Sequence, residues 1–173
     1  MALYLITGTS GVGKSAVRGE LRRRGYVAYG SDEDGLARWF DNTSGAEVRL
    51  PDQRGDEWFA RNTYRLPPET VRRIAAEPGH RFICGTVGNE GEIWELFTAV
   101  VCLTVDATTL RRRLSARTGG FGSTEDEIRR ILGWHQTVAE DNERYGALLV
   151  DASGPVEDVV DALLTALRLP LDL

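Results

Sequence analysis

The sequence predicts an α/β fold with a parallel sheet, and three observations lead to that prediction. Short apolar runs alternate with longer amphipathic segments, which is the pattern of βαβ units. The runs are rich in β-branched and aromatic residues, as strands covered on both faces are. A glycine-rich loop at residues 8–15 separates the first run from the first amphipathic segment. A length of 173 residues without repeats or a linker predicts one domain, residues 1–173.

Each element follows from its local pattern. Strands are expected at residues 3–7, 26–29, 81–84, 100–105 and 147–150. Helices are expected at residues 14–24, 33–40, 68–76, 92–97, 108–117, 124–142 and 156–167. Gly25 stands where glycine closes the first helix, and Ser123 and Thr124 precede acidic residues as the capped start of the sixth.

Two segments interrupt the alternation. Residues 41–65 are polar and contain Trp58 and Phe59, and residues 118–123 form a short link with three glycines between two helices. In a nucleotide-binding α/β fold, these segments are candidates for a substrate-covering region and a lid; the alternative is that both are ordinary loops. Trp58 and Phe59 are either core residues or a stacking surface for a planar substrate.

The glycine-rich loop matches the P-loop pattern G-x-x-x-x-G-K-[ST] in full, as Gly8-Thr9-Ser10-Gly11-Val12-Gly13-Lys14-Ser15. Backbone N–H groups of such a loop point at phosphate oxygens, and the following helix adds its positive end. We expect Lys14 to reach the β- and γ-phosphates and the Ser15 hydroxyl to ligate Mg²⁺. The expected nucleotide-binding residues of this segment are Gly8, Ser10, Gly11, Val12, Gly13, Lys14, Ser15 and Ala16. A dinucleotide fingerprint also fits from Gly11 to Ala16, but it leaves Lys14 and Ser15 without a role.

Composition narrows the class of protein. Lys14 is the only lysine in the chain, so the one compact ammonium group stands where a phosphate is expected. A net charge of −5 and a pI of about 5.1 argue against a nucleic-acid partner. Cys84 and Cys102 lie in apolar runs and are expected to be buried thiols. No run suggests a signal peptide or a membrane partner, which indicates a cytoplasmic protein.

Acidic residues follow the second strand, at the sheet edge where ligands bind in parallel sheets. Asp32 is the first choice to orient or deprotonate an acceptor hydroxyl and to help hold Mg²⁺, and Asp34 is the second choice as a substrate-binding residue. The alternative is that Ser31 or Asp32 caps a helix.

Arg113 and Arg117 lie four residues apart ahead of the expected lid, and therefore share a helix face. We expect Arg113 to bind the nucleotide and Arg117 to stabilise charge during phosphoryl transfer. Arg111 and Arg112 are expected on the solvated surface.

Further candidates for binding the substrate are Thr86 and Asn89, in the small-residue loop after the third strand, and Arg61. The arginines of residues 52–61 suit a carboxylate or phosphate group. Asp106 and Asp151 end strands and are expected to cap helices or play structural roles, and His80 and His135 are expected to be structural or exposed.

With these motifs, the chain resembles the small P-loop kinases, the group of adenylate kinase-like nucleotide kinases, shikimate kinases and gluconate kinases. The resemblance implies a three-layer α/β/α P-loop NTPase fold, with a five-stranded parallel sheet in the order 2-3-1-4-5 and a short lid. It matches Asp32 to the aspartate that contacts the acceptor hydroxyl in shikimate kinases, although Gly30 replaces the first acid of their Asp-x-Asp pair. It also likens Arg113 and Arg117 to arginines that contact ATP in adenylate kinases, and residues 152–155 to the loop that borders the adenine.

The function expected from these residues and this resemblance is ATP-dependent phosphotransfer to a small-molecule acceptor, with ATP and Mg²⁺ as cofactors. A nucleoside or nucleotide acceptor is slightly favoured over a shikimate- or sugar-like one. The alternative is a non-catalytic ATP-binding regulatory module; a GTPase is disfavoured because its guanine-reading motif needs a second lysine. The expected partners are ATP and the acceptor, and the chain is expected to be a monomer or a homodimer.

Overall fold

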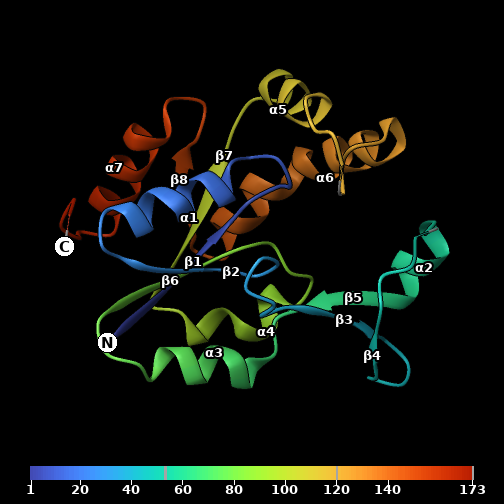
Figure 1. Cartoon of the computed structure of the whole chain (residues 1–173), viewed down its shortest axis with the longest axis horizontal. Coiled ribbons are helices and arrows are strands. Elements are labelled where there is room, and N and C mark those ends of the chain that lie inside the picture. Colours follow the sequence, from blue (N-terminus) through green and yellow to red (C-terminus); the bar gives the residue numbers. More distant parts are fainter. Residues whose placement is uncertain (53, 120, 173) are drawn as a thin grey trace.

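The computed structural model describes residues 1–52, 54–119 and 121–172, and its centre is a five-stranded parallel sheet (Figure 1). The strands are β1 (Ala2–Thr7), β2 (Val27–Gly30), β6 (His80–Cys84), β7 (Ala99–Thr104) and β8 (Leu148–Asp151). They lie in the order β2-β6-β1-β7-β8, so β1 is central and pairs with β6 and β7. Numbered among the parallel strands alone, this is the order 2-3-1-4-5, as the sequence resemblance implied.

Helices cover both faces of the sheet because successive side chains of each strand point to opposite faces. Tyr4 and Ile6 of β1 pack against α1 (Lys14–Arg23), α5 (Ala107–Ser115), α6 (Glu125–Arg144) and α7 (Val156–Ala166). Leu3 and Leu5 pack against α3 (Pro68–Ala75) and α4 (Glu90–Ile93), which continues as a 3₁₀ turn, η1 (Trp94–Leu96). The three-layer architecture is therefore confirmed (Figure 1).

The expected helix ends are also present. Gly25 follows α1 with φ of 89°, a left-handed conformation that glycine adopts without strain. The side chain of Asp106 caps α5 by accepting a hydrogen bond from the Thr109 N–H, and Thr124 caps α6 in the same way from Glu127. Cys84 and Cys102 are both buried and free, as expected.

The prediction of a helix at residues 33–40 is wrong. Residues 31–35 form a turn, and the chain continues as β3 (Arg38–Asp41). Asp34 accepts a hydrogen bond from the Gly30 N–H at 2.7 Å, and Gly35 adopts φ of 63°, so the backbone reverses instead of continuing as a helix. The aromatic side chain of Trp39 then packs on Tyr64 across a strand pair, a setting that aromatic residues favour.

Residues 41–65, expected to be a substrate-covering region or an ordinary loop, form most of a small antiparallel sheet in the order β4-β3-β5, together with a short helix. β3 pairs with β4 (Glu47–Val48) and β5 (Asn62–Arg65), and α2 (Asp56–Arg61) precedes β5. In Figure 1 this unit, residues 38–65, extends to one side of the main sheet. We call it the cover; Gln53 within it, and Gly120 of the expected lid, lie outside the described residues.

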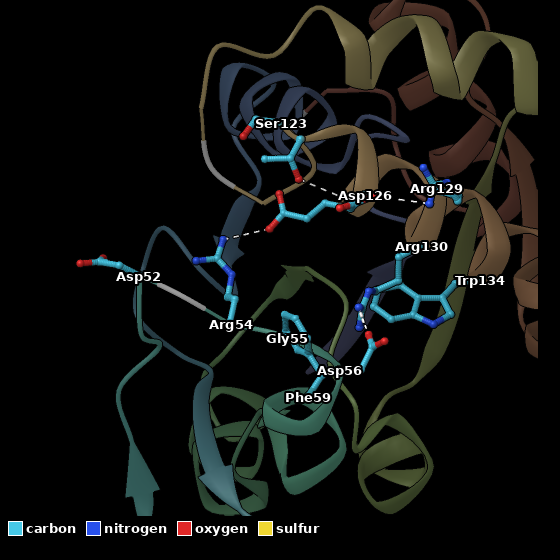
Figure 2. Close-up of a pocket in the computed structure, with 12 residues that line it drawn as sticks. Asp52, Arg54, Gly55, Asp56, Phe59, Ser123, Asp126, Arg129, Arg130 and Trp134 are labelled. Atoms are coloured by element: carbon cyan, nitrogen blue, oxygen red, sulfur yellow. Dashed lines mark hydrogen bonds and ion pairs between the residues drawn. The ribbon is translucent and has the colours of Figure 1, made fainter.

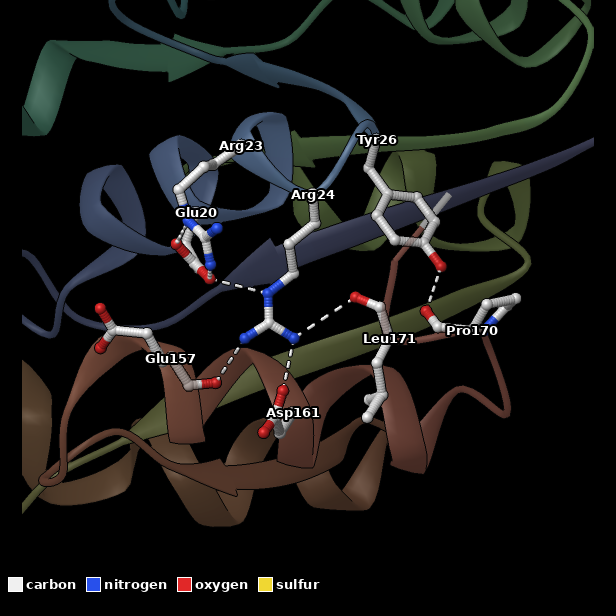
Figure 3. A network of polar contacts seen from close by, with 8 residues as sticks. All are labelled: Glu20, Arg23, Arg24, Tyr26, Glu157, Asp161, Pro170 and Leu171. Atoms are coloured by element: carbon white, nitrogen blue, oxygen red, sulfur yellow. Dashed lines mark hydrogen bonds and ion pairs between the residues drawn. The ribbon is translucent and has the colours of Figure 1, made fainter.

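A buried arginine joins α1 to α7 and to the segment after it (Figure 3). The Arg24 side chain is only 7% exposed; it donates to Glu20 at 2.7 Å, to the Glu157 carbonyl at 2.9 Å and to Asp161. Nearby, the Tyr26 hydroxyl donates to the Pro170 carbonyl. A buried charge is tolerated because these acceptors replace its water.

Among the described residues, no helix combines the length and the apolar character needed to cross a membrane.

Candidate active site

The P-loop joins β1 to α1 in a conformation that requires its glycines. Gly8 has φ of 130° and Gly13 has φ of 119°, both in the left-handed region. A Cβ atom on Gly8 would also lie 2.6 Å from the Leu103 carbonyl oxygen, which leaves no room for a side chain. The loop therefore lies tightly against β7, with its curved backbone at the carboxyl edge of the sheet.

Lys14 lies across this loop. Its ammonium group donates to the carbonyls of Gly8 at 2.6 Å and Thr9 at 3.0 Å. Burial lowers the pKa of Lys14 to about 8, although Glu90 and Asp32 oppose that shift. An incoming triphosphate would restore the full positive charge, because negative phosphate oxygens favour the protonated amine.

Ser15 lies beside a carboxylate that the sequence analysis did not choose. The exposed Ser15 hydroxyl donates to Glu33 Oε1 at 2.8 Å, and Glu33 also forms an ion pair with Arg18 at 3.3 Å. A hydroxyl and a carboxylate are the oxygen ligands that Mg²⁺ prefers, so this pair fits the metal expected with a triphosphate. The sequence offered four consecutive polar residues here, and the local pattern alone did not distinguish Glu33.

Asp32 and Asp34 have different surroundings. Asp32 Oδ1 accepts from the Tyr64 hydroxyl of the cover at 2.6 Å and from Ser31 Oγ at 3.0 Å. Burial and the neighbouring Asp32 raise the pKa of Tyr64, so Tyr64 stays a donor. Asp34 instead accepts from the Gly30 N–H and from Arg22 at 2.9 Å. Asp32 is thus linked to the cover, whereas Asp34 is turned back on β2.

Glu90 is a second carboxylate that the sequence analysis missed. It stands at the start of α4 and accepts from Thr7 Oγ1, at the end of β1, at 2.6 Å. Burial raises its pKa, and the nearby Lys14 charge opposes that shift. Its only sequence signal was its place after β6, with five residues between Cys84 and Glu90, and this spacing does not reveal that Glu90 approaches β1.

Two arginines and a histidine tie the P-loop to the helices behind it. Arg113 donates to the carbonyls of Val12 and Ala152, both at 2.8 Å, and so joins the P-loop to the loop after β8. Arg117 donates to Ser10 Oγ at 3.2 Å and to the Phe121 carbonyl in the expected lid at 2.7 Å. His135 of α6 bridges Thr9 Oγ1 and the Val105 carbonyl, at 2.9 and 2.8 Å.

The remaining sequence candidates are placed less closely together. Thr86 donates to the Gly8 carbonyl and therefore adjoins the P-loop. Asn89 is buried, and its side-chain amide bonds both backbone groups of Leu66, at 2.9 and 3.0 Å. Arg61 is 74% exposed and lies 3.7 Å from Asp41. Asn89 thus bonds to Leu66, directly after the cover, and Arg61 lies beside Asp41 within the cover.

A cavity of about 1120 Å³ lies between the cover and the start of α6 (Figure 2). One side is lined by Asp52, Arg54, Gly55, Asp56 and Phe59, and the other by seven residues between Ser123 and Trp134. Its lining does not include Asp32 or the P-loop, but Phe59 in its wall lies 5.7 Å from Trp39, whose ring is 5.2 Å from Tyr64. The cavity and Asp32 are therefore joined by one row of aromatic side chains from the cover.

Comparison with protein families matches a model described as an AAA domain to residues 5–130. Comparison with curated proteins gives no match to this sequence.

Solved structures share the fold over nearly the whole chain. A gluconokinase from Sinorhizobium meliloti 1021 is 20% identical, with a TM-score of 0.57 over 96% of this chain and 91% of the gluconokinase. A shikimate kinase from Bacteroides thetaiotaomicron is 16% identical, with a TM-score of 0.61 over 97% of this chain and 99% of that enzyme. A shikimate kinase from Aquifex aeolicus is 19% identical, with a TM-score of 0.59 over 97% and 96% of the two chains.

Proposed function

Since the chain belongs to the AAA domain family, we propose that it uses ATP to phosphorylate a hydroxyl group of a small molecule. The observation that carries this proposal is a complete P-loop whose Lys14 and Ser15 lie at the same sheet edge as Asp32. Asp32 in turn accepts a hydrogen bond from Tyr64 of the cover. The fold likeness to enzymes named gluconokinase and shikimate kinase supports it.

The nucleotide would lie along the P-loop. Lys14 would leave the Gly8 and Thr9 carbonyls and neutralise the β- and γ-phosphates. Ser15, with Glu33 or Asp32, would hold Mg²⁺, which supplies positive charge at the phosphate oxygens when bound. Arg113 would support the nucleotide through the loops that it joins, and Arg117, bonded to Ser10, would stabilise charge on the transferring group.

Asp32 would act on the acceptor. The carboxylate would accept the proton of the acceptor hydroxyl while the hydroxyl oxygen bonds to the γ-phosphorus and the bond to ADP breaks. The hydrogen bond from Tyr64 fixes the Asp32 side chain from the cover side, so the same contact positions the carboxylate and the cover.

The acceptor that we propose is a small molecule with a hydroxyl group. The structures compared above are named as kinases of gluconate and shikimate, and give no support to the preference for a nucleoside or nucleotide acceptor. They give no support to the alternative of a non-catalytic regulator either.

A phosphotransfer screen tests this function. ADP formation from Mg·ATP is measured with sugars, hydroxy acids, nucleosides and nucleotides, for the wild type, Lys14→Ala and the surface control Arg112→Ala. We expect acceptor-dependent ADP formation that Lys14→Ala abolishes and Arg112→Ala retains. ATP binding without any acceptor-dependent turnover would favour the regulatory alternative instead.

A further inference from the structure

The arginines that line the cavity form ion pairs with acidic residues of its wall, and two of these three pairs span the cavity. Arg54 of the cover lies 3.1 Å from Glu127 of α6, and in the opposite sense Asp56 of the cover pairs with Arg130 of α6 (Figure 2). The third arginine in the wall, Arg129, lies 3.4 Å from Asp126. Every arginine that lines the cavity thus has a carboxylate partner within the wall.

The Arg54–Glu127 pair is the most protected of the three. The two side chains are only 19% and 16% exposed, whereas those of Arg129 and Asp126 are 73% and 89% exposed. Arg54 also donates to the Pro51 carbonyl at 3.3 Å, and the second oxygen of Glu127 accepts from the Gly122 N–H at 3.0 Å. Both members are therefore fixed in place on their own segments, and separating them would leave a half-buried charge without its partner.

An anionic acceptor would meet an unfavourable balance here. The lining holds three arginines and four acids, the fourth acid being Asp52. A carboxylate or phosphate would compete with these acids for the arginines and would lie beside them. Because Lys14 is the only lysine and belongs to the P-loop, no lysine in the cavity wall can replace that arginine.

The apolar part of the wall suits a ring without charge. Phe59 lies under the Arg130 guanidinium at 5.0 Å, and Trp134, half exposed, lies against Phe121 with ring centres 6.2 Å apart. Aromatic faces of this kind pack against the C–H face of a sugar ring or against a nucleobase. The row from Phe59 through Trp39 to Tyr64 leads from this wall to Asp32.

We propose that the acceptor is an uncharged ring compound bearing hydroxyl groups, which enters through the cavity between the cover and α6. The inference rests on the proposed kinase function, and it separates this chain from kinases whose acceptors are acids. A sugar and a nucleoside share the required chemistry.

Matched acceptor pairs test the charge preference directly. Each pair keeps the ring and differs by one anionic group: methyl shikimate and shikimate, glucose and glucuronate, uridine and uridine monophosphate. With Mg·ATP, the neutral member of the preferred pair should have a kcat/KM at least about tenfold higher, as expected when a site leaves a charge unpaired. The preferred pair tells a sugar-like acceptor from a nucleoside, and an acid preferred to its neutral partner would overturn the proposal.

A binding measurement tests, without turnover, whether the cavity rejects an anionic ligand. Glucuronate is titrated against tryptophan fluorescence, with a non-hydrolysable ATP analogue and Mg²⁺ present, because Trp134 lines the cavity. The wild type should show no saturable change, whereas Glu127→Gln, which frees Arg54 and keeps an acceptor for Gly122, should gain binding that salt weakens. Asp126→Asn removes the same charge from an exposed pair and should behave like the wild type.

The two proposals fail in different ways. Saturable glucuronate binding by the wild type that Arg54→Gln removes, or no gain in a folded Glu127→Gln protein, would overturn the neutral acceptor and leave the kinase function standing. Absence of phosphotransfer to every compound, with the binding results as expected, would instead count against the kinase function alone.

Discussion

Single side chains at the P-loop are held by groups that a nucleotide would replace. The Lys14 ammonium bonds two loop carbonyls, and the Ser15 hydroxyl bonds Glu33. Binding a triphosphate therefore exchanges contacts within the chain for contacts with phosphate, and the protonation of Lys14 is part of that exchange.

The lowered pKa of Lys14 predicts proton uptake on binding. Below a pH of about 8 the amine is charged before and after binding, so few protons are taken up. Above about 8 the free protein has lost the proton, and the phosphates restore it by raising the pKa. Calorimetry of the Mg²⁺ complex of a non-hydrolysable ATP analogue, in buffers of different ionisation enthalpy, should give uptake that rises towards one proton at pH 9 and an affinity that falls over the same range. Equal uptake at pH 7 and pH 9 would contradict this.

Asp32 and Asp34 are expected to differ in function. Asp32→Asn should keep nucleotide affinity within a few-fold but lower kcat by roughly 10²–10⁴-fold, the range of a general base or positioning group. Asp34→Asn should lower stability more than kcat, because its carboxylate holds the turn after β2. Steady-state kinetics and thermal unfolding of both variants make the comparison; a large kcat loss in Asp34→Asn alone would reverse the two roles.

Sequence analysis identified the residues whose role depends on local spacing, and missed those that depend on distant contacts. The P-loop residues, Gly25 and the Asp106 cap all follow from neighbours a few positions away. Tyr64 reaches Asp32 across 32 positions and His135 reaches Thr9 across 126, so only the folded chain brings them together.

Among helices and strands, the hydrophobic pattern was sufficient to predict those that form the main sheet or pack on it. The five parallel strands and the helices packed on them were all expected, with ends that differ by a few residues. It failed at residues 33–40, where acidic residues suggested the first turn of a helix. There the bonds of Asp34 to β2 and the pairing of β3 with β5 outweighed helix propensity.

Arg117, which precedes the expected lid, connects it to the P-loop, and this connection predicts how the lid behaves. Arg117 joins Ser10 to Phe121, so the lid should become more protected when nucleotide and acceptor bind. Hydrogen exchange across residues 118–123, with and without a non-hydrolysable ATP analogue, Mg²⁺ and acceptor, measures this. Arg117→Ala should lower kcat more than it weakens ATP binding, whereas Arg113→Ala should mainly weaken ATP binding. Unchanged exchange together with wild-type kinetics in Arg117→Ala would reduce the segment to a surface loop.

For the whole molecule, the polar network around Glu20 and Arg24 makes the free energy of unfolding depend on pH in acid. Hydrogen bonds from Arg23 and Arg24 lower the pKa of Glu20 to about 2, from an ordinary value of 4.5. As the pH falls below about 4.5, the unfolded chain takes up a proton at this position before the folded chain does, so the free energy of unfolding decreases until the pH reaches about 2.

Replacement of Glu20 isolates this contribution. Urea unfolding of the wild type and Glu20→Gln should show a stability difference that is full above a pH of about 4.5 and shrinks towards pH 2. Glu157→Gln is the matched control, because Arg24 donates to the Glu157 backbone carbonyl, which this substitution keeps. A difference that does not change with pH would assign Glu20 a role in packing alone.

The central position of β1 has a consequence for how the protein is made. β1 leaves the ribosome before both of its partners, which begin at His80 and Ala99. Until His80 has been synthesised this strongly apolar strand has both edges unpaired, and one edge stays unpaired until Ala99 has been added; such edges recruit other chains. The cover, by contrast, pairs strands that are close in sequence and can form early. The yield of native protein should therefore depend on how well the nascent N-terminal strand is shielded by chaperones, more than on the stability of the finished fold.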